Sequence, residues 1–368
     1  MSSPVDSESA EPYLFTDKDS TVFLSWIEKR DTISFLKYSR LEGETWSQPK
    51  TIDSGSNWFV NWADYPVMAS DGKQFLANIL QKSNQEKYSY DVKLLASGDG
   101  LNWSDAGLLH NDSVSAEHGF VSLVPFHEGA FACWLDGRNT GGGGHDHNEH
   151  HGAMTIRAAT LGYNGKKTEE WELDNRVCDC CQTTAAVTDN GPVVIYRDRS
   201  DEEVRDMSIV RFVNGSWTTP KPIYKDNWKI DGCPVNGPRC DALGNTLAIA
   251  WFSVLNDQPE VKVIFSNDGG ATFLNPTRID EGNTKGRVDL VLLDEQHAMV
   301  SWMEGPNIQV AIISNDGVKA KITVASSSEA RSSGFPQLTK SGNRIFLAWT
   351  DDESKRIRVA SLTYNLTR

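Results

Sequence analysis

Four cysteines give this sequence its strongest chemical signal. Cys178, Cys180 and Cys181 stand together in the motif CDCC, and Cys233 opens the motif CPVNGP further along the chain. Thiolates at this density bind soft metals, so a Cu or Zn site is one interpretation. Disulfides that tie neighbouring segments together are a second, and a redox-active pair of Cys180 and Cys181 is a third. The spacing is not that of a standard zinc finger, so the motif leaves all three open.

A glycine- and histidine-rich segment is a second candidate metal site. Residues 141–151 read GGGGHDHNEHH and contain half of the eight histidines. Imidazoles beside carboxylates at this density capture Zn, Cu or Ni, and a mixed site with the cysteines is a further hypothesis. The candidate ligands in this segment are His145, His147, His150 and His151.

Arginines, carboxylates and tryptophans form a third group, suited to an anionic or sugar-like ligand. Arginine binds carboxylate or sulfate through paired hydrogen bonds, and tryptophan stacks on sugar rings. The alternative for each charged residue is an ordinary surface ion pair, which is common and weak. The candidate ligand-binding residues are Trp58, Trp62, Asp64, Arg197, Arg205, Trp228 and Arg331.

Seven similar segments must position these residues. Each has a short apolar strand, a turn and a second strand that usually ends in an aromatic residue, and the spacing of roughly 50 residues is typical of a β-propeller. We therefore predict an all-β fold, a β-propeller of four-stranded antiparallel blades, with seven blades favoured and six as the alternative. The segments are residues 12–26, 66–79, 120–134, 183–196, 234–251, 288–302 and 336–349.

The propeller prediction brings the candidate residues to one face. The loop that leads into each innermost strand and the loop between the second and third strands open on the same face, around the channel mouth. We expect the cysteines, the histidine-rich segment and the arginines to share this rim. Cys133, inside an apolar strand, is expected to be a buried small hydrophobe, and Cys240 to be either buried or bonded.

The turns between strands carry a repeated motif. Its clearest copy has Ser266, Asp268, Gly270, Thr272 and Phe273, and weaker copies occur at residues 39–46, 97–103, 214–217 and 314–317. This motif resembles the Asp-box, or BNR repeat, of the sialidase-like propellers. In that family the box is a structural hairpin remote from the active site, so the resemblance implies that Asp268 belongs to the scaffold.

The resemblance also suggests reactions. A sialidase uses three arginines, a tyrosine nucleophile activated by a glutamate, and an aspartate. The family's first arginine would stand where this chain has Glu11, Pro12 and Tyr13, so an ordinary sialidase is not expected. Some seven-bladed polysaccharide lyases are similar in architecture and abstract a proton beside a uronate with a histidine and a tyrosine. The candidate catalytic residues are His118, Asp136, Arg138, Tyr196, Arg199 and Arg287, although the place of Tyr196 at the closing aromatic position of its repeat favours a core aromatic.

Composition limits the partners. The 368 residues carry 36 Lys and Arg against 50 Asp and Glu, a net charge of -14, which argues against nucleic acid or an anionic membrane. No apolar run approaches the roughly 18 residues of a membrane span, so membrane insertion is not expected. We expect residues 1–10 to be a disordered tail, residues 11–368 to be one propeller, and the protein to be a monomer. An extracytoplasmic location is favoured, with the signal peptide absent from this numbering.

These observations predict an atypical sialidase-like propeller that binds or processes an acidic glycan or a similar polar ligand at the channel mouth. The first alternative is a noncatalytic propeller with a Cys and His site for Cu or Zn, or with a binding surface stabilised by disulfides. The second alternative is a polysaccharide lyase.

Overall fold

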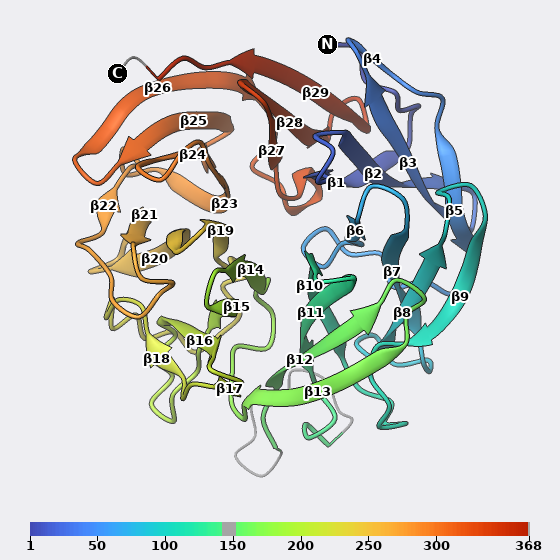
Figure 1. Cartoon of the computed structure of the whole chain (residues 1–368), viewed down its shortest axis with the longest axis horizontal. Coiled ribbons are helices and arrows are strands. Elements are labelled where there is room, and N and C mark those ends of the chain that lie inside the picture. The colour runs from blue at the N-terminus through green and yellow to red at the C-terminus, as the bar shows by residue number, and fades with distance from the viewer. Residues whose placement is uncertain (142–151, 367–368) are drawn as a thin grey trace.

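The chain folds into a ring of seven antiparallel sheets around a central channel (Figure 1). A computed structural model describes residues 1–141 and 152–366. Each sheet is one blade of strands that follow one another in sequence, and the first strand of each blade lines the channel. The predictions of an all-β propeller and of seven blades are confirmed.

The first three blades occupy residues 9–174. Blade 1 consists of β1 (Ser9–Thr16), β2 (Val22–Arg30), β3 (Ile33–Glu42), β4 (Thr45–Trp46) and β5 (Lys50–Gly55). Blade 2 consists of β6 (Met68–Ser70), β7 (Phe75–Lys82), β8 (Tyr90–Ser97) and β9 (Trp103–Leu108). Blade 3 consists of β10 (His118–Phe126), β11 (Gly129–Asp136), β12 (Thr155–Gly162) and β13 (Lys167–Asp174).

The remaining blades complete the ring. Blade 4 consists of β14 (Thr184–Thr188), β15 (Gly191–Arg197), β16 (Met207–Val213), β17 (Ser216–Trp217) and β18 (Lys221–Pro222). Blade 5 consists of β19 (Arg239–Leu243), β20 (Thr246–Leu255), β21 (Gln258–Ser266) and β22 (Thr277–Arg278). Blade 6 consists of β23 (Thr284–Leu292), β24 (His297–Glu304), β25 (Asn307–Ser314) and β26 (Gly317–Ser326). The short helix η1 (Arg331–Ser333) leads into blade 7, which consists of β27 (Gln337–Ser341), β28 (Arg344–Asp351) and β29 (Arg356–Thr363).

In blades 1 and 4 two short strands share the outer position. Both β4 and β5 pair with β3, and both β17 and β18 pair with β16. Blade 7 has three described strands. The ring therefore keeps four strand positions in six blades and three in the last.

Aromatic residues at the ends of the second strands form the cores between blades. Trp26, Trp134, Trp251 and Trp302 are fully buried, and Tyr196 takes the corresponding place in blade 4. Packed aromatics of this size contribute strongly to the core, since truncation to alanine typically costs about 3–5 kcal/mol. The repeated aromatic recognised in the sequence is thus a packing position.

The hairpin at Ser266 has a closed hydrogen-bond pattern around Asp268. Its carboxylate accepts hydrogen bonds from the Ser266 hydroxyl at 2.7 Å and from the Thr272 amide at 2.8 Å. The Asp99 carboxylate makes the same kind of turn after β8, where it accepts from the Leu101 amide at 2.7 Å. Both carboxylates are occupied in holding their own turns, which agrees with a scaffold role.

The first and last blades meet without exchanging a strand among the described residues. The Ser9 amide donates to the Lys355 carbonyl at 3.2 Å, and the Thr16 and Thr339 hydroxyls lie 2.8 Å apart. The sequence predicts a disordered tail over residues 1–10, whereas β1 begins at Ser9 and Val5 is buried against the core of blades 1 and 7. Residues 1–10 pack at the junction of blades 1 and 7 because the apolar side chain of Val5 is buried in the core there.

Candidate functional site

The CDCC motif forms a compact sulfur cluster between blades 4 and 5. The Sγ atom of Cys178 lies 3.5 Å from that of Cys181 and 3.9 Å from that of Cys180, and all three side chains are buried. Cys233, on the loop leading into blade 5, is partly buried and makes a hydrogen bond with Cys180. The predicted meeting of the two cysteine motifs therefore occurs.

A close backbone approach joins the two motifs. The Gln182 side chain, directly after CDCC, accepts a hydrogen bond from the Gly237 amide of CPVNGP at 2.9 Å. A Cβ atom on Gly237 would lie 2.1 Å from the Gln182 carbonyl oxygen. Glycine is the residue that permits this contact, because any side chain there would collide with backbone.

All six cysteines are free thiols in the structure. The separation of 3.5 Å between the Cys178 and Cys181 sulfurs is well beyond a disulfide bond of about 2.05 Å. The predicted disulfides are therefore not found. Cys133 is buried, as predicted, and Cys240 is partly buried with its amide donating to the Thr184 hydroxyl at 3.3 Å.

Two arginines place positive charge beside the sulfur cluster. Arg205 is fully buried and donates from Nη1 to the Cys178 sulfur at 3.2 Å. Burial opposes ionisation of Cys181, but hydrogen bonds from Cys178 and Cys180 and the charge of Arg197 outweigh it and hold the pKa of Cys181 well below its usual value. Cys181 alone has a lowered pKa, because burial raises the pKa of Cys178 to about 11 and the hydrogen bond with Cys178 raises that of Cys180. A lowered pKa favours the thiolate, the form that binds metals.

Arg197 and Arg199 are not free to bind an anionic ligand, because protein groups already occupy their guanidinium groups. Arg197 is buried and donates from Nη2 to the carbonyls of Asn236 and Phe252, each at 2.7 Å. The Arg199 guanidinium pairs with Asp179 at 3.1 Å and with Glu203 at 2.8 Å. These side chains hold loops of the rim together, which the sequence could not distinguish from ligand binding.

The Arg287 guanidinium is also occupied by hydrogen bonds within the protein. It is buried, and its guanidinium donates to the Ser333 hydroxyl at 2.6 Å and to the carbonyls of Ala330 and Gly334 at 3.0 and 3.1 Å. Burial and the charge of Arg331 lower the pKa of Arg287 to about 10. The residue therefore fixes the loop leading into blade 7.

The other predicted catalytic residues lie inside the blades. Tyr196 is buried and donates to Asp174 at 2.6 Å. His118 and Asp136 are both fully buried at the contact between blades 2 and 3. Arg138 donates to the Asp136 carboxylate from Nε and Nη2, each at 2.7 Å. The catalytic roles of these residues remain predictions, and none of the buried three faces solvent in this structure.

Of the remaining ligand-binding candidates, Trp62 and Arg331 lie at the surface. Trp62 is partly exposed and stacks on Phe335 with ring centroids 5.6 Å apart. The Arg331 guanidinium is exposed and lies 5.9 Å from the centre of the Trp62 ring. Trp58 and Trp228 are buried. The rim thus offers one aromatic and cationic platform beside the channel.

Asp64 is a buried carboxyl at the edge of blade 2. It accepts hydrogen bonds from the Phe120 amide at 2.7 Å and from the Tyr90 hydroxyl at 3.0 Å. Burial raises the pKa of Asp64 to about 7, although both hydrogen bonds oppose the change. The Tyr90 hydroxyl also lies 2.9 Å from a Glu117 oxygen, so two carboxyls share one hydroxyl.

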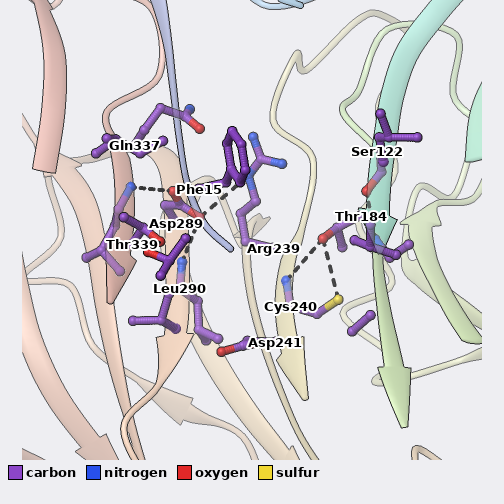
Figure 2. Close-up of a pocket in the computed structure, with 18 of the residues that line it drawn as sticks. Phe15, Ser122, Thr184, Arg239, Cys240, Asp241, Asp289, Leu290, Gln337 and Thr339 are labelled. Atoms are coloured by element: carbon purple, nitrogen blue, oxygen red, sulfur yellow. Dashed lines mark hydrogen bonds and ion pairs between the residues drawn. The ribbon is translucent and has the colours of Figure 1, made fainter. Parts of the chain in front are cut away.

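The central channel is a cavity of about 410 Å³ lined by the inner strands. Figure 2 shows the hydrogen bonds that link neighbouring inner strands around the channel, including those of Cys240 with Thr184. Asp289 accepts from the Leu338 amide of the next blade at 2.7 Å, and the Arg239 guanidinium lies 3.8 Å from its carboxylate. These polar groups join neighbouring blades.

Three residues near His118 were missed by the sequence analysis. His110, Asp112 and Asp91 lie against it at the contact between blades 2 and 3. The sequence held a signal, because His110 and Asp112 stand in the short loop that leads directly to His118 at the start of β10. The predicted ligands His145, His147, His150 and His151 lie outside the described residues.

The sequence matches no family model, and no curated protein matches it. Within the described residues, no helix has the length and apolar character needed to cross a bilayer.

Several solved structures share the fold. The α-L-arabinofuranosidase Arb93A from Fusarium graminearum is 12% identical, with a TM-score of 0.53 over 97% of this chain and 93% of that one. A PL25 ulvan lyase is 10% identical, with a TM-score of 0.53 over 86% and 81%. The propeller domain of the Trilobed protease from Pyrococcus furiosus, described as having an open velcro topology, is 11% identical, with a TM-score of 0.52 over 96% and 97%.

The chain spans 63% of the length of the Hadza microbial sialidase Hz136, at a TM-score of 0.46. Glycan-processing enzymes are thus among the propellers that this chain resembles. At these identities the likeness establishes the propeller fold, and the chemistry must be argued from the side chains.

Proposed function

We propose that this propeller binds a soft metal ion, Cu(I), at Cys178, Cys180 and Cys181. The observation that carries the proposal is the approach of three buried sulfurs, which all lie within 4.8 Å of one another. Sulfur donors select soft ions, and a thiolate is the ligand form. No other described residues bring three thiols together.

The charges around the cluster favour a thiolate complex. Three thiolates around a monovalent ion leave net negative charge, which is costly in a buried site without compensation. Arg205, in contact with Cys178, and Arg197, whose charge acts on Cys181, supply that compensation. Buried cationic neighbours therefore support an anionic metal complex.

Zn²⁺ is the competing ion at the same site. It prefers four ligands in a tetrahedral arrangement, and Cys233 would be the fourth. Cys233 is only partly buried and belongs to the next blade, whereas the CDCC sulfurs already form a set of three. A three-sulfur set suits Cu(I), and a Cys233 substitution separates the two ions experimentally.

The test is anaerobic titration of the reduced full-length protein with Cu(I) in the presence of a competing chelator. We expect one tightly bound Cu(I), lost in Cys178→Ser and Cys181→Ser and retained in Cys240→Ser, the matched control outside the cluster. Cys233→Ser should leave Cu(I) bound but weaken Zn²⁺. Equal Cu(I) binding by the wild type and both cluster variants would refute the proposal, as would a stable Cys178 to Cys181 disulfide.

Carbohydrate binding at the rim is the second candidate function. It is supported by the exposed Arg331 guanidinium beside the partly exposed Trp62 ring, a pairing that suits an acidic sugar. The guanidinium groups of Arg197, Arg199 and Arg287 already bind protein groups, which weighs against a larger binding site for the acidic sugar. Lyase chemistry at His118 would require that buried side chain to become accessible.

Calorimetry with uronate oligosaccharides tests this second function. Binding by the wild type that falls at least about tenfold in Arg331→Gln would support it, and Lys340→Gln, on β27, provides a charge-matched control. Ultraviolet detection of unsaturated products distinguishes a lyase from a binding protein. An absence of binding to every acidic oligosaccharide would exclude the platform as a sugar site.

The monomeric state and the extracytoplasmic location remain predictions.

A further inference from the structure

Two histidines stack face to face where blades 2 and 3 meet. The rings of His110 and His118 are nearly parallel, at 4°, with centroids 3.7 Å apart. His118 begins β10, and His110 lies on the loop that joins β9 to β10. His110 is 3% exposed and His118 is fully buried. The two rings are therefore packed together with almost no exposure to solvent.

Three of the four ring nitrogens lack a hydrogen bond. They are Nε2 of His110 and both nitrogens of His118. A buried polar atom without a partner typically costs about 1–3 kcal/mol, and native structures contain few of them. The Asp112 carboxylate lies 3.2 Å from His118 Nε2, so His110 Nε2 and His118 Nδ1 are the two nitrogens that a partner other than protein would complete.

Asp91 faces one edge of the stacked pair. Its Oδ1 lies 3.4 Å from His110 Nε2 and 4.0 Å from His118 Nδ1. Ligand atoms that sit about 2.0–2.2 Å from one metal ion lie roughly 3.0–3.6 Å apart, so these separations are close to those required by a common ion. Because a metal lies in the plane of each imidazole that binds it, one of the two parallel rings must turn out of the stack when the ion binds. The Asp91 side chain is 18% exposed, which leaves this edge open to solvent.

Asp112 faces the opposite edge of the same pair. Its Oδ2 lies 3.1 Å from His110 Nδ1 and 3.2 Å from His118 Nε2. A carboxylate on the far nitrogen of a metal-binding histidine orients the ring and raises its basicity. Asp112 therefore supports both imidazoles at one edge of the stacked pair, while Asp91 lies at the opposite edge.

The charge at this contact favours a cation. Three carboxylates, those of Asp91, Asp112 and Asp136, surround the two imidazoles, whereas Arg138 provides one compensating charge through Asp112 and Asp136. The excess of negative charge is the reverse of the cysteine cluster. A divalent ion would neutralise it.

We propose that His110 Nε2, His118 Nδ1 and Asp91 Oδ1 bind a divalent first-row transition metal, with Asp112 as the shared supporting carboxylate. Two histidines and one carboxylate with the remaining positions open are the ligand set of Fe(II), Mn²⁺ or Zn²⁺ sites. The set differs in residues, charge and softness from the proposed Cu(I) site. The propeller would then carry two metal sites of different chemistry on one face.

Titration of the metal-free, full-length protein with Co²⁺ tests the proposal. Cobalt on nitrogen and oxygen ligands gives visible d–d bands without the thiolate charge-transfer band that the cysteine cluster would produce. We expect Asp91→Asn and His110→Gln to weaken the nitrogen and oxygen site more than about 100-fold, because loss of even an outer-shell partner costs about 10- to 100-fold. Asp105→Asn and His127→Gln, at exposed positions on the same blades, are the matched controls.

Thermal unfolding with Zn²⁺ separates a metal ligand from a purely structural residue. The comparison uses a protein that carries Cys178→Ser and Cys181→Ser, so that zinc cannot bind the cysteine cluster. At zinc concentrations near 100 times Kd, its midpoint should rise by about 5 °C, and the rise should disappear when Asp91→Asn is added. Without metal, Asp91→Asn should remain folded, since the exposed edge of the cluster tolerates an amide. Equal Co²⁺ affinity in all variants, or a midpoint unaffected by Zn²⁺, would overturn the proposal. Cysteine variants should leave this site intact, whatever their effect on Cu(I).

Discussion

The contact between blades 2 and 3 and the contact between blades 4 and 5 have opposite electrostatic character. The first gathers carboxylates around two imidazoles, with Arg138 as the counterion. The second gathers guanidinium groups around three thiols, with Arg205 in direct contact with sulfur. Both lie where a loop enters an inner strand, so the same position in the fold supports different chemistry.

The blades determine where the two contacts lie, whereas the loops supply the charged side chains that distinguish them. A carboxylate-rich contact stabilises a divalent cation, and an arginine-rich contact stabilises thiolates or their anionic metal complex. Neither property follows from the propeller fold itself. Substitutions of the buried charged residues at each contact should therefore have separate and recognisable effects.

Removal of Asp136 should have the largest effect. It is fully buried and accepts hydrogen bonds from the Trp134 indole at 2.8 Å and from Arg138 at 2.7 Å. Asp136→Ala removes the acceptor of a buried indole and the nearest carboxylate of Arg138, which keeps Asp112 and Glu170. We therefore expect a loss of about 3–5 kcal/mol in the free energy of unfolding, from one unsatisfied buried donor and the lost charged hydrogen bonds. Urea denaturation measures it. Asp201→Ala, at an exposed position, should change stability by less than about 0.5 kcal/mol, and equal effects would contradict this account.

Removal of Arg205 should have the next largest effect. It is fully buried, and besides the Cys178 contact it donates to Glu203 at 2.6 Å. Arg205→Met should cost about 2–3 kcal/mol, because hydrogen bonds to charged groups are lost. The same variant should weaken Cu(I) binding and leave the cobalt site unchanged. Arg356→Met at an exposed position is the control, and loss of both metals would show that the two contacts are not independent.

The carboxylate-rich contact should also make stability depend on pH. The pKa of Asp64 is raised to about 7, so the folded protein keeps a proton that the unfolded chain loses near pH 4. Stability should then fall as pH rises from about 4 to 7, by at most about 1.4 kcal/mol per pH unit for this group. Asp64→Asn should flatten this part of the profile, as measured by chemical denaturation at several pH values. Parallel wild-type and variant profiles would show that Asp64 ionises normally.

A turn outside both contacts should give the smallest effect, with the opposite pH dependence. Although burial opposes it, the hydroxyl and amide of Thr272 lower the pKa of Asp268 to about 2. Its stabilisation should be complete above about pH 4 and lost as pH falls through about 2. Asp268→Ala should cost about 1 kcal/mol at pH 7 and almost nothing at pH 2 by thermal unfolding. A constant difference at both pH values would argue against an ionised Asp268.

The sequence predicts what the repeat fixes. Regular spacing and closing aromatics predict the blades, and the loop positions predict that Cys178 and Cys180 meet Cys233 of the next blade. The structure agrees because these features depend on each blade and its immediate neighbour. The last blade differs from the prediction of four strands in every blade, because its sheet has three strands among the described residues.

The sequence could not predict where individual side chains make their hydrogen bonds. Arg287 looks like an anion ligand, yet its guanidinium reaches carbonyls at Ala330 and Gly334 through the approach of two blades. The His110 and His118 stack likewise depends on the path of a loop without regular structure. Such contacts are decided by tertiary packing, which residue types and spacing do not encode individually.

Blade 1 acquires all of its strands between Ser9 and Gly55. On the ribosome it could therefore complete its hydrogen-bonded sheet while the later blades are still being synthesised, without waiting for a strand from the far end of the chain. Each further blade would add to an existing neighbour. Vectorial synthesis would then set the order of assembly, with the junction of blades 1 and 7 made last.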